Sequence, residues 1–193
     1  MRSTRSSESQ PRFPQRVSHN LFFALQPGEE ARARINAEAR RLRDAHPAAG
    51  RWINPQRYHL TLSFLGGHAT LPEGLVAAAA DVGNRVRVSS FSFALDIAGS
   101  FANRAIPWWI GCREMPPELG ALWDAISAGL EGCGLRATQD RAPHVTILRD
   151  ADRLLPTTPI GPIIWPVEEF VLVDSLLGPE PNHTVLSRWR LSR

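Results

Sequence analysis

Two short segments of this chain repeat one pattern, in which a histidine, any residue, a threonine and an aliphatic residue follow one another inside a strand-like run. They read Tyr58-His59-Leu60-Thr61-Leu62-Ser63-Phe64 and Pro143-His144-Val145-Thr146-Ile147-Leu148. Side chains alternate between the two faces of a β-strand. Each histidine should therefore share a face with its threonine, while Leu60, Leu62 and Phe64 take the other face in the first segment. Two such strands facing one cleft would present two imidazoles and two hydroxyls to it.

That set of side chains suits attack on a phosphodiester. A neutral imidazole can take a proton from water, and a protonated one can give a proton to the departing oxygen. The hydroxyls can donate hydrogen bonds to the phosphoryl oxygens, where negative charge develops. Histidine fits both roles because its pKa lies near neutrality. We expect no cofactor and no metal, because neither motif has a carboxylate nearby at the spacing of a metal-ligand set.

A third copy of the pattern, His68-Ala69-Thr70, shows how weak a single match is. It follows two glycines and precedes Pro72, which is typical of a loop leading into a helix. We assign it no catalytic role. The pairing of two copies with matched strand alternation carries the hypothesis.

Composition and charge limit the other possibilities. Of 193 residues, 43% are hydrophobic and 21% charged, as in ordinary globular proteins. We expect a disordered basic tail over residues 1–19 and a single domain over residues 20–193. The tail carries four arginines and one glutamate, which account for the whole formal charge of +3. Because the remainder is neutral, its charge does not indicate a long nucleic-acid groove.

The expected location is the cytoplasm. Cys112 and Cys133 form neither a disulfide framework nor a zinc-binding spacing. No apolar run approaches the roughly 18 residues of a membrane span, so we expect no membrane association. The tail lacks the apolar segment of a secretory signal, although its composition also allows a transit peptide.

Hydrophobic periodicity predicts an α+β fold. Helices are expected after Pro27-Gly28, near 72–86 and near 116–131, each with an apolar stripe at helical spacing. The region 150–166 contains four prolines and is predicted to be a loop, and residues 178–182 are predicted to form a turn. Strands are expected at 21–25, 91–97, 106–112, 143–148, 168–176 and 184–191.

The chain resembles the 2H phosphoesterase superfamily, and more closely its RNA 2′,3′-cyclic phosphodiesterases, also called 2′-5′ RNA ligases. The resemblance runs from about residue 20 to 193. It is carried by Leu21-Phe22-Phe23-Ala24-Leu25, Trp52, His59 to Gly66, Trp109-Ile110-Gly111, Pro143 to Ile147 with Arg149, and Phe170 to Leu177.

The resemblance implies a bilobal fold in which two related halves each supply one motif strand to a central cleft. It implies hydrolysis of an RNA 2′,3′-cyclic phosphate end to a 2′-phosphate, with reversible 2′-5′ joining of RNA ends as a second activity. By position, His59 would be the proton donor to the 3′-oxygen and His144 the proton acceptor from water. Thr61 and Thr146 would hold the phosphate.

Arg149 corresponds to a family arginine at the phosphate, and a guanidinium can bind phosphate bidentately. Strict alternation places it on the face opposite His144, so this role requires the strand to end or bulge near Leu148. Two residues depart from the family pattern: Asn20 replaces a basic residue, and His183 replaces an aromatic one and is interpreted as a turn or edge residue. Aromatic candidates for stacking on a base are Phe23, Trp52, Phe101, Trp108 and Trp109, of which Phe101 is the least core-like.

Alternatives remain open at this level. The same four residues could act on a small cyclic phosphate or a 2′-5′-linked oligonucleotide. A non-catalytic module that binds RNA ends is a further possibility, although binding alone needs neither an acid nor a base. The expected partner is the 3′ end of an RNA bearing a 2′,3′-cyclic phosphate, and the expected state is a monomer.

Overall fold

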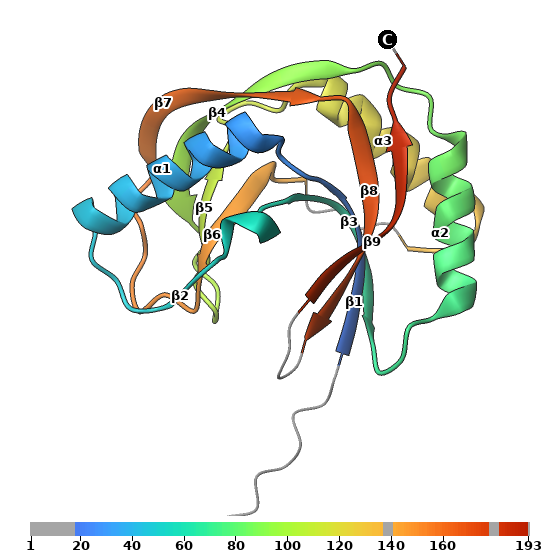
Figure 1. Ribbon diagram of the computed structural model, residues 1–193, viewed down its shortest axis with the longest axis horizontal. Coiled ribbons are helices and arrows are strands. Elements are labelled where there is room, and N and C mark those ends of the chain that lie inside the picture. Colours follow the sequence, from blue (N-terminus) through green and yellow to red (C-terminus); the bar gives the residue numbers. More distant parts are fainter. Residues whose placement is uncertain (1–17, 137–140, 178–181, 193) are drawn as a thin grey trace, which may run out of the picture.

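The computed structural model describes residues 18–136, 141–177 and 182–192, which form three helices against a large antiparallel sheet (Figure 1). The helices are α1 (Glu29–Ala45), α2 (Glu73–Arg85) and α3 (Pro117–Gly132), with a short 3₁₀ turn at Pro55–Arg57. The strands are β1 (Ser18–Leu25), β2 (Arg51–Trp52), β3 (Leu60–His68), β4 (Phe91–Ser100), β5 (Trp108–Gly111), β6 (His144–Arg149), β7 (Thr158–Val167), β8 (Glu169–Leu177) and β9 (Asn182–Arg190).

The sheet consists of two halves of four strands. Its order is β7-β4-β5-β6-β3-β1-β8-β9, with the short β2 paired to β6. The two motif strands, β6 and β3, are the inner strands of the halves, and they meet through the pair Leu60 and Val145. The α+β class and the bilobal arrangement expected from the sequence are confirmed. Within the described chain, no helix is both long and apolar enough to cross a membrane.

The helices form where their apolar stripes predict them. In α1, Ala31, Ile35, Ala39 and Leu42 are buried, and the helix packs against β7. Glutamates in its first turn and Arg43 in its last complement the helix dipole. Helix α3 packs against β3 and α2, and α2 also contacts β9, so these two helices cover the other half (Figure 1).

The prediction of a loop over residues 150–166 is wrong for its second half, because Thr158–Val167 forms strand β7. This strand lies at one end of the sheet and pairs only with β4 among the described strands. Proline cannot donate to a sheet ladder and is tolerated on edge strands. Pro159 and Pro166 stand in the paired register, and Pro162 falls at an irregularity between Ile163 and Pro159. The prolines therefore mark a sheet edge rather than a loop.

Two further boundaries differ from expectation. Strand β1 begins at Ser18, two residues before the expected start of the domain, and His19 Nδ1 lies 2.8 Å from Asp174 Oδ2. His68 is the last residue of β3 rather than part of a loop, and it pairs with His19 of β1. The rest of the expected tail, and residues 178–181 of the expected turn, lie outside the described residues.

Candidate active site

A cleft of about 460 Å³ lies where the two halves of the sheet meet. Four residues singled out from the sequence line it: His59, Thr61, Thr146 and Arg149. The others come from five strands and the segment before β3, and they are Asn20, Phe22, Arg51, Ile53, Arg57, Phe64, Ser175, Leu177 and His183.

The junction of β3 and β6 brings the two motifs together. Leu60 pairs with Val145 in antiparallel register, and both side chains are fully buried beneath the sheet. Continued by one residue in each direction, this register sets His59 beside Thr146 and Thr61 beside His144. Directly opposed residues share a face, so each histidine lies next to the other motif's threonine on one face of the sheet. Of these four residues, His59, Thr61 and Thr146 line the cleft and His144 does not.

Both histidines are anchored in the same way. His59 Nδ1 lies 2.7 Å from the carbonyl oxygen of Arg57, and His144 Nδ1 lies 2.7 Å from that of Ala142. A carbonyl can only accept, so each Nδ1 carries a proton and donates it. The anchored tautomer leaves Nε2 as the nitrogen that gains or loses a proton in each ring.

Arg149 reaches the cleft through a β-bulge. Thr146 pairs with Trp109 and Leu148 with Trp108, so Ile147 is an extra residue in β6. Its carbonyl oxygen accepts a 2.9 Å hydrogen bond from the backbone of Ile53, outside that pairing. The bulge buries two consecutive side chains, Ile147 and Leu148, and returns Arg149 to the face of His144.

The first motif strand has a bulge at the equivalent position, and here the sequence prediction for Phe64 is wrong. Ser63 pairs with Phe23 and Thr61 with Ala24, which leaves Leu62 as the extra residue. The carbonyl of Leu62 accepts a hydrogen bond from the indole of Trp123 in α3. Phe64 therefore does not join Leu60 and Leu62 in the core but is 44% exposed and lines the cleft.

Neither Phe101 nor His144 is among the residues that line the cleft. Their rings lie against one another beside it. Their ring centroids are 5.0 Å apart in an edge-on arrangement, and Trp109 lies 5.2 Å from Phe101. Two of the other aromatic candidates, Phe23 and Trp108, are fully buried in the core. Trp52 packs edge-on against Trp108. Among the aromatic residues, it is Phe22 and Phe64 that line the cleft.

The cleft is cationic. Arg51, Arg57 and Arg149 line it, and none of the described lining residues is an aspartate or glutamate. Partial burial, together with the charge of Arg51, lowers the pKa of both Arg57 and Arg149, and Arg57 is lowered further by Arg149. These guanidinium groups repel one another, so an anion such as phosphate would relieve the repulsion.

The same surroundings disfavour protonation of His59 and His183 in the empty cleft. Burial lowers the pKa of His59 to about 4 against the opposing effect of its bond to the Arg57 carbonyl, with Arg149, His144 and Arg57 lowering it further. Burial lowers the pKa of His183 to about 3, with smaller contributions from His59, Arg57 and Arg149. A bound anion would favour the protonated form of His59.

Three basic or titratable residues of the cleft were not assigned to the site by the sequence analysis: Arg51, Arg57 and His183. His183 does lie in an edge strand, β9, as interpreted, but its Nε2 also lies 3.0 Å from Arg57 Nη2 and its ring contacts that of His59. Arg57 stands two residues before the motif histidine, which is the signal that could have found it. No local pattern marks His183, since β9 reaches the cleft only through its pairing with β8.

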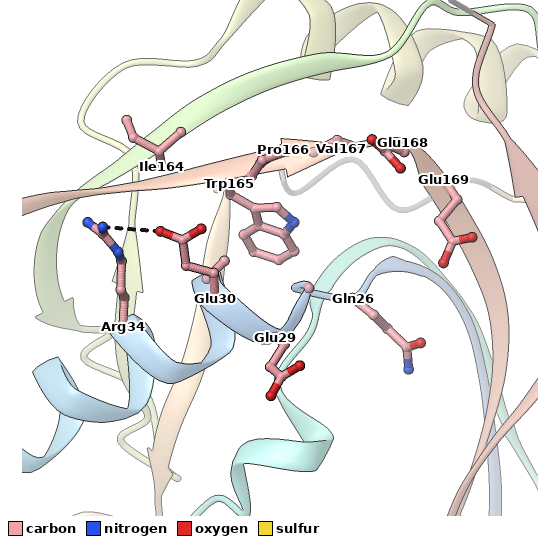
Figure 2. Close-up of a pocket in the computed structure, with 12 residues that line it drawn as sticks. Gln26, Glu29, Glu30, Arg34, Ile164, Trp165, Pro166, Val167, Glu168 and Glu169 are labelled. Carbon is pink, nitrogen blue, oxygen red and sulfur yellow. Dashed lines mark ion pairs between the residues drawn. The ribbon is translucent and has the colours of Figure 1, made fainter.

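A second cleft, of about 510 Å³, lies between the start of α1 and the junction of β7 and β8 (Figure 2). Its charges are of the opposite kind, because four glutamates line it and Arg34 is paired with Glu30 at 3.1 Å. Carboxylates repel a phosphate, so this cleft does not suit the chemistry of the motifs. Neither cleft suggests a metal centre, since no three metal-ligating side chains gather among the described residues.

His59, Thr61 and Thr146 line a cationic cleft at the centre of a two-lobed sheet, and the strand register places His144 beside Thr61. This set of side chains is that of a phosphoesterase. Comparison with known proteins agrees. Residues 25–109 match the family model described as LigT like Phosphoesterase, a span that includes the first motif. The RNA 2′,3′-cyclic phosphodiesterase of Escherichia coli is 33% identical over 180 residues, covering 90% of this chain and 97% of that protein. The chain therefore belongs to the LigT-like phosphoesterases of the 2H superfamily.

Other relatives extend the similarity to the whole fold. The RNA 2′,3′-cyclic phosphodiesterase of Thermus thermophilus is 32% identical, covering 89% of each chain. A crystal structure of E. coli LigT in complex with 3′-AMP superposes with a TM-score of 0.76 at 31% identity, covering 91% of this chain and 99% of that one. A structure described only as a phosphoesterase gives a TM-score of 0.78 at the same identity and coverage.

Proposed function

We propose that this phosphoesterase hydrolyses the 2′,3′-cyclic phosphate at the 3′ end of an RNA to a 2′-phosphate. The carrying observation is the cationic cleft in which the two anchored histidine motifs meet. Relatives named RNA 2′,3′-cyclic phosphodiesterase support the choice of substrate. A relative crystallised with 3′-AMP supports a terminal nucleotide as the bound group.

In this proposal His144 takes a proton from water through Nε2, and the water attacks phosphorus. The bond from phosphorus to the 3′-oxygen breaks, and His59 gives its Nε2 proton to that oxygen. The hydroxyls of Thr61 and Thr146 and the guanidinium of Arg149 bind the phosphoryl oxygens as charge develops there. Each proton transfer contributes roughly 10²–10⁴-fold. The assignment of acid and base follows the family resemblance.

The negative charge of the substrate favours the protonated form of His59, which its role as an acid requires. With a pKa of about 4, His59 is neutral in the empty cleft at pH 7. The cyclic phosphodiester brings one negative charge among three arginines and the histidines, and this charge raises the pKa of His59. Protonation of the acid is thus coupled to substrate binding.

The nucleotide would rest on the aromatic side of the cleft. The exposed ring of Phe64 offers a face on which a base can stack. Phe101, which the sequence analysis assigned to substrate binding, would contact the nucleotide from the side of His144, against which it packs. Contact limited to one or two terminal nucleotides fits the neutral body of the domain. A monomer in the cytoplasm and reversible 2′-5′ joining of RNA ends are part of the same proposal.

Phosphorus NMR on a short RNA ending in a 2′,3′-cyclic phosphate, with EDTA present, tests the proposal. Wild-type protein should give a 2′-phosphate, and His59→Ala and His144→Ala should each abolish turnover. His68→Ala is the matched control, because it removes the histidine of the third copy, which does not line the cleft. A 3′-phosphate product would reverse the leaving-group assignment. Turnover only on small cyclic phosphates or 2′-5′ oligonucleotides, or no turnover at all, would reject the proposed substrate.

A further inference from the structure

His183 lines the cleft together with His59, and the two rings lie against one another. His183 stands in β9 opposite buried Ser175 of β8. Its ring meets that of His59 edge-on with centroids 5.3 Å apart. Phe22 stacks on His59 at 4.9 Å and meets His183 edge-on at 6.0 Å. The imidazole of His59 is therefore in contact with rings from both β1 and β9.

Arg57 connects the two histidines. Its carbonyl oxygen accepts the Nδ1 proton of His59 at 2.7 Å, and its guanidinium Nη2 lies 3.0 Å from Nε2 of His183. A guanidinium has donors only and keeps its proton in proteins. Nε2 of His183 must then accept, so His183 is neutral with its proton on Nδ1.

We infer that Arg57 and His183 form a positioning pair for His59, in which Arg57 holds His183 as a neutral ring of one tautomer and that ring fixes the plane of His59. The inference rests on the proposed function only in that His59 transfers a proton. It assigns a role to two residues that lie 126 positions apart and that the histidine–threonine motifs do not include.

The charges around His59 explain why neutrality of His183 matters. The groups that face His59 are Arg57, Arg149, His144 and His183, and each is a cation or can become one. A protonated His183 would add a positive charge at van der Waals range and would lose its bond from Arg57. Burial and the neighbouring cations keep the pKa of His183 at about 3, in agreement with a neutral ring at every working pH.

Nitrogen-15 NMR of the histidine rings in the full chain tests the pair without relying on turnover. His183, assigned by its loss in His183→Phe, should show a single neutral tautomer with its proton on Nδ1 between pH 5 and 8. Arg57→Met removes both the donor and the charge, so the single tautomer should be lost and the pKa of His183 should rise by about one unit or more. A doubly protonated His183 at pH 7 in the wild type, or an unchanged tautomer in Arg57→Met, would overturn the inference.

Kinetics test the second part of the inference, namely that the pair positions His59. His183→Phe keeps a ring of similar size but cannot accept from Arg57. This variant and Arg57→Met should each lower kcat about tenfold, and the double variant should lose no more than the worse single one, because the two residues act as a unit. Thr184→Ala, the exposed neighbour in β9, is the control and should keep wild-type kcat. An unchanged kcat in His183→Phe, or losses that multiply in the double variant, would contradict the pair. Failure of the wild type to hydrolyse the RNA would reject the proposed function and leave the NMR result standing.

Discussion

Phe64 and Arg149 occupy equivalent positions in the two halves of the sheet. Each lies five residues after its motif histidine, and each returns to the histidine face because the residue three after that histidine is bulged out of register. In both bulges the carbonyl oxygen of the extra residue accepts a hydrogen bond from outside the strand pairing. Leu62 accepts from the indole of Trp123, and Ile147 accepts from the backbone N–H of Ile53. One structural device thus delivers an aromatic ring from one half and a guanidinium from the other to the same cleft.

Replacement of Phe64 should weaken binding of the nucleotide without slowing the chemistry. Stacking of a base on an aromatic ring is worth about 1–3 kcal/mol, so Phe64→Ala should raise KM roughly 5- to 150-fold at nearly constant kcat. Phe64→Tyr keeps the ring and should remain close to wild type. The comparison substrate is an abasic ribose 2′,3′-cyclic phosphate, for which Phe64→Ala should change KM little. Equal losses on both substrates would show that the ring shapes the cleft rather than contacting the base.

The pH dependence of the two kinetic constants should differ in a defined direction. In the free enzyme the pKa of His59 is about 4, below its usual value, so the protonated acid becomes scarcer as the pH rises. Bound phosphate raises that pKa. The alkaline limb of kcat, which reports the complex, should therefore lie at higher pH than the alkaline limb of kcat/KM, which reports the free enzyme. Full pH–rate profiles measure both, and coincident limbs would argue against coupling between substrate charge and His59.

Removal of the Arg149 charge should weaken phosphate binding and raise the pKa of His59. Charged hydrogen bonds of this kind are worth about 1.5–3 kcal/mol, so Arg149→Gln should raise KM roughly 10- to 150-fold. Because Arg149 lowers the pKa of His59, the variant should also show a higher His59 pKa by NMR titration. Arg153→Gln is the control, because the side chain of Arg153 forms an exposed ion pair with Asp152 and Arg153 does not line the cleft. An unchanged His59 pKa in Arg149→Gln would place the guanidinium outside electrostatic range.

Local pattern was enough to predict which residues of the two motifs share a face of the sheet. Period-two alternation correctly sets each histidine and threonine on one face, because no irregularity falls between His59 and Thr61 or between His144 and Thr146. It fails just beyond, at Leu62 and Ile147, since a bulge is stabilised by partners that the strand sequence does not contain. The need for a bulge near Leu148 could be stated from the position of Arg149, whereas nothing in the first motif demanded one at Leu62.

Residues joined only by tertiary pairing were beyond the sequence analysis. His183 reaches the cleft because β9 pairs with β8, which pairs with β1, and each pairing depends on the fold as a whole. The prolines of β7 were misleading for a related reason. Proline excludes a central strand but not an edge strand, and which strand lies at the edge is a property of the complete sheet.

The packing of α2 against β9 should make the protein more stable with glycine at position 83 than with alanine, although alanine has the higher helix propensity. Alanine is favoured over glycine in a helix by about 1 kcal/mol, but a Cβ on Gly83 would overlap the ring of Trp189. That ring is stacked on Phe170 with centroids 5.0 Å apart, so it cannot move without disturbing the core. Overpacking of this kind costs about 1–3 kcal/mol, and Gly83→Ala should therefore lower the free energy of unfolding in urea. Gly74→Ala in the same helix meets nothing within 4 Å and should leave stability equal or slightly higher. A stabilised Gly83→Ala would mean that α2 stands farther from β9 than the structure places it.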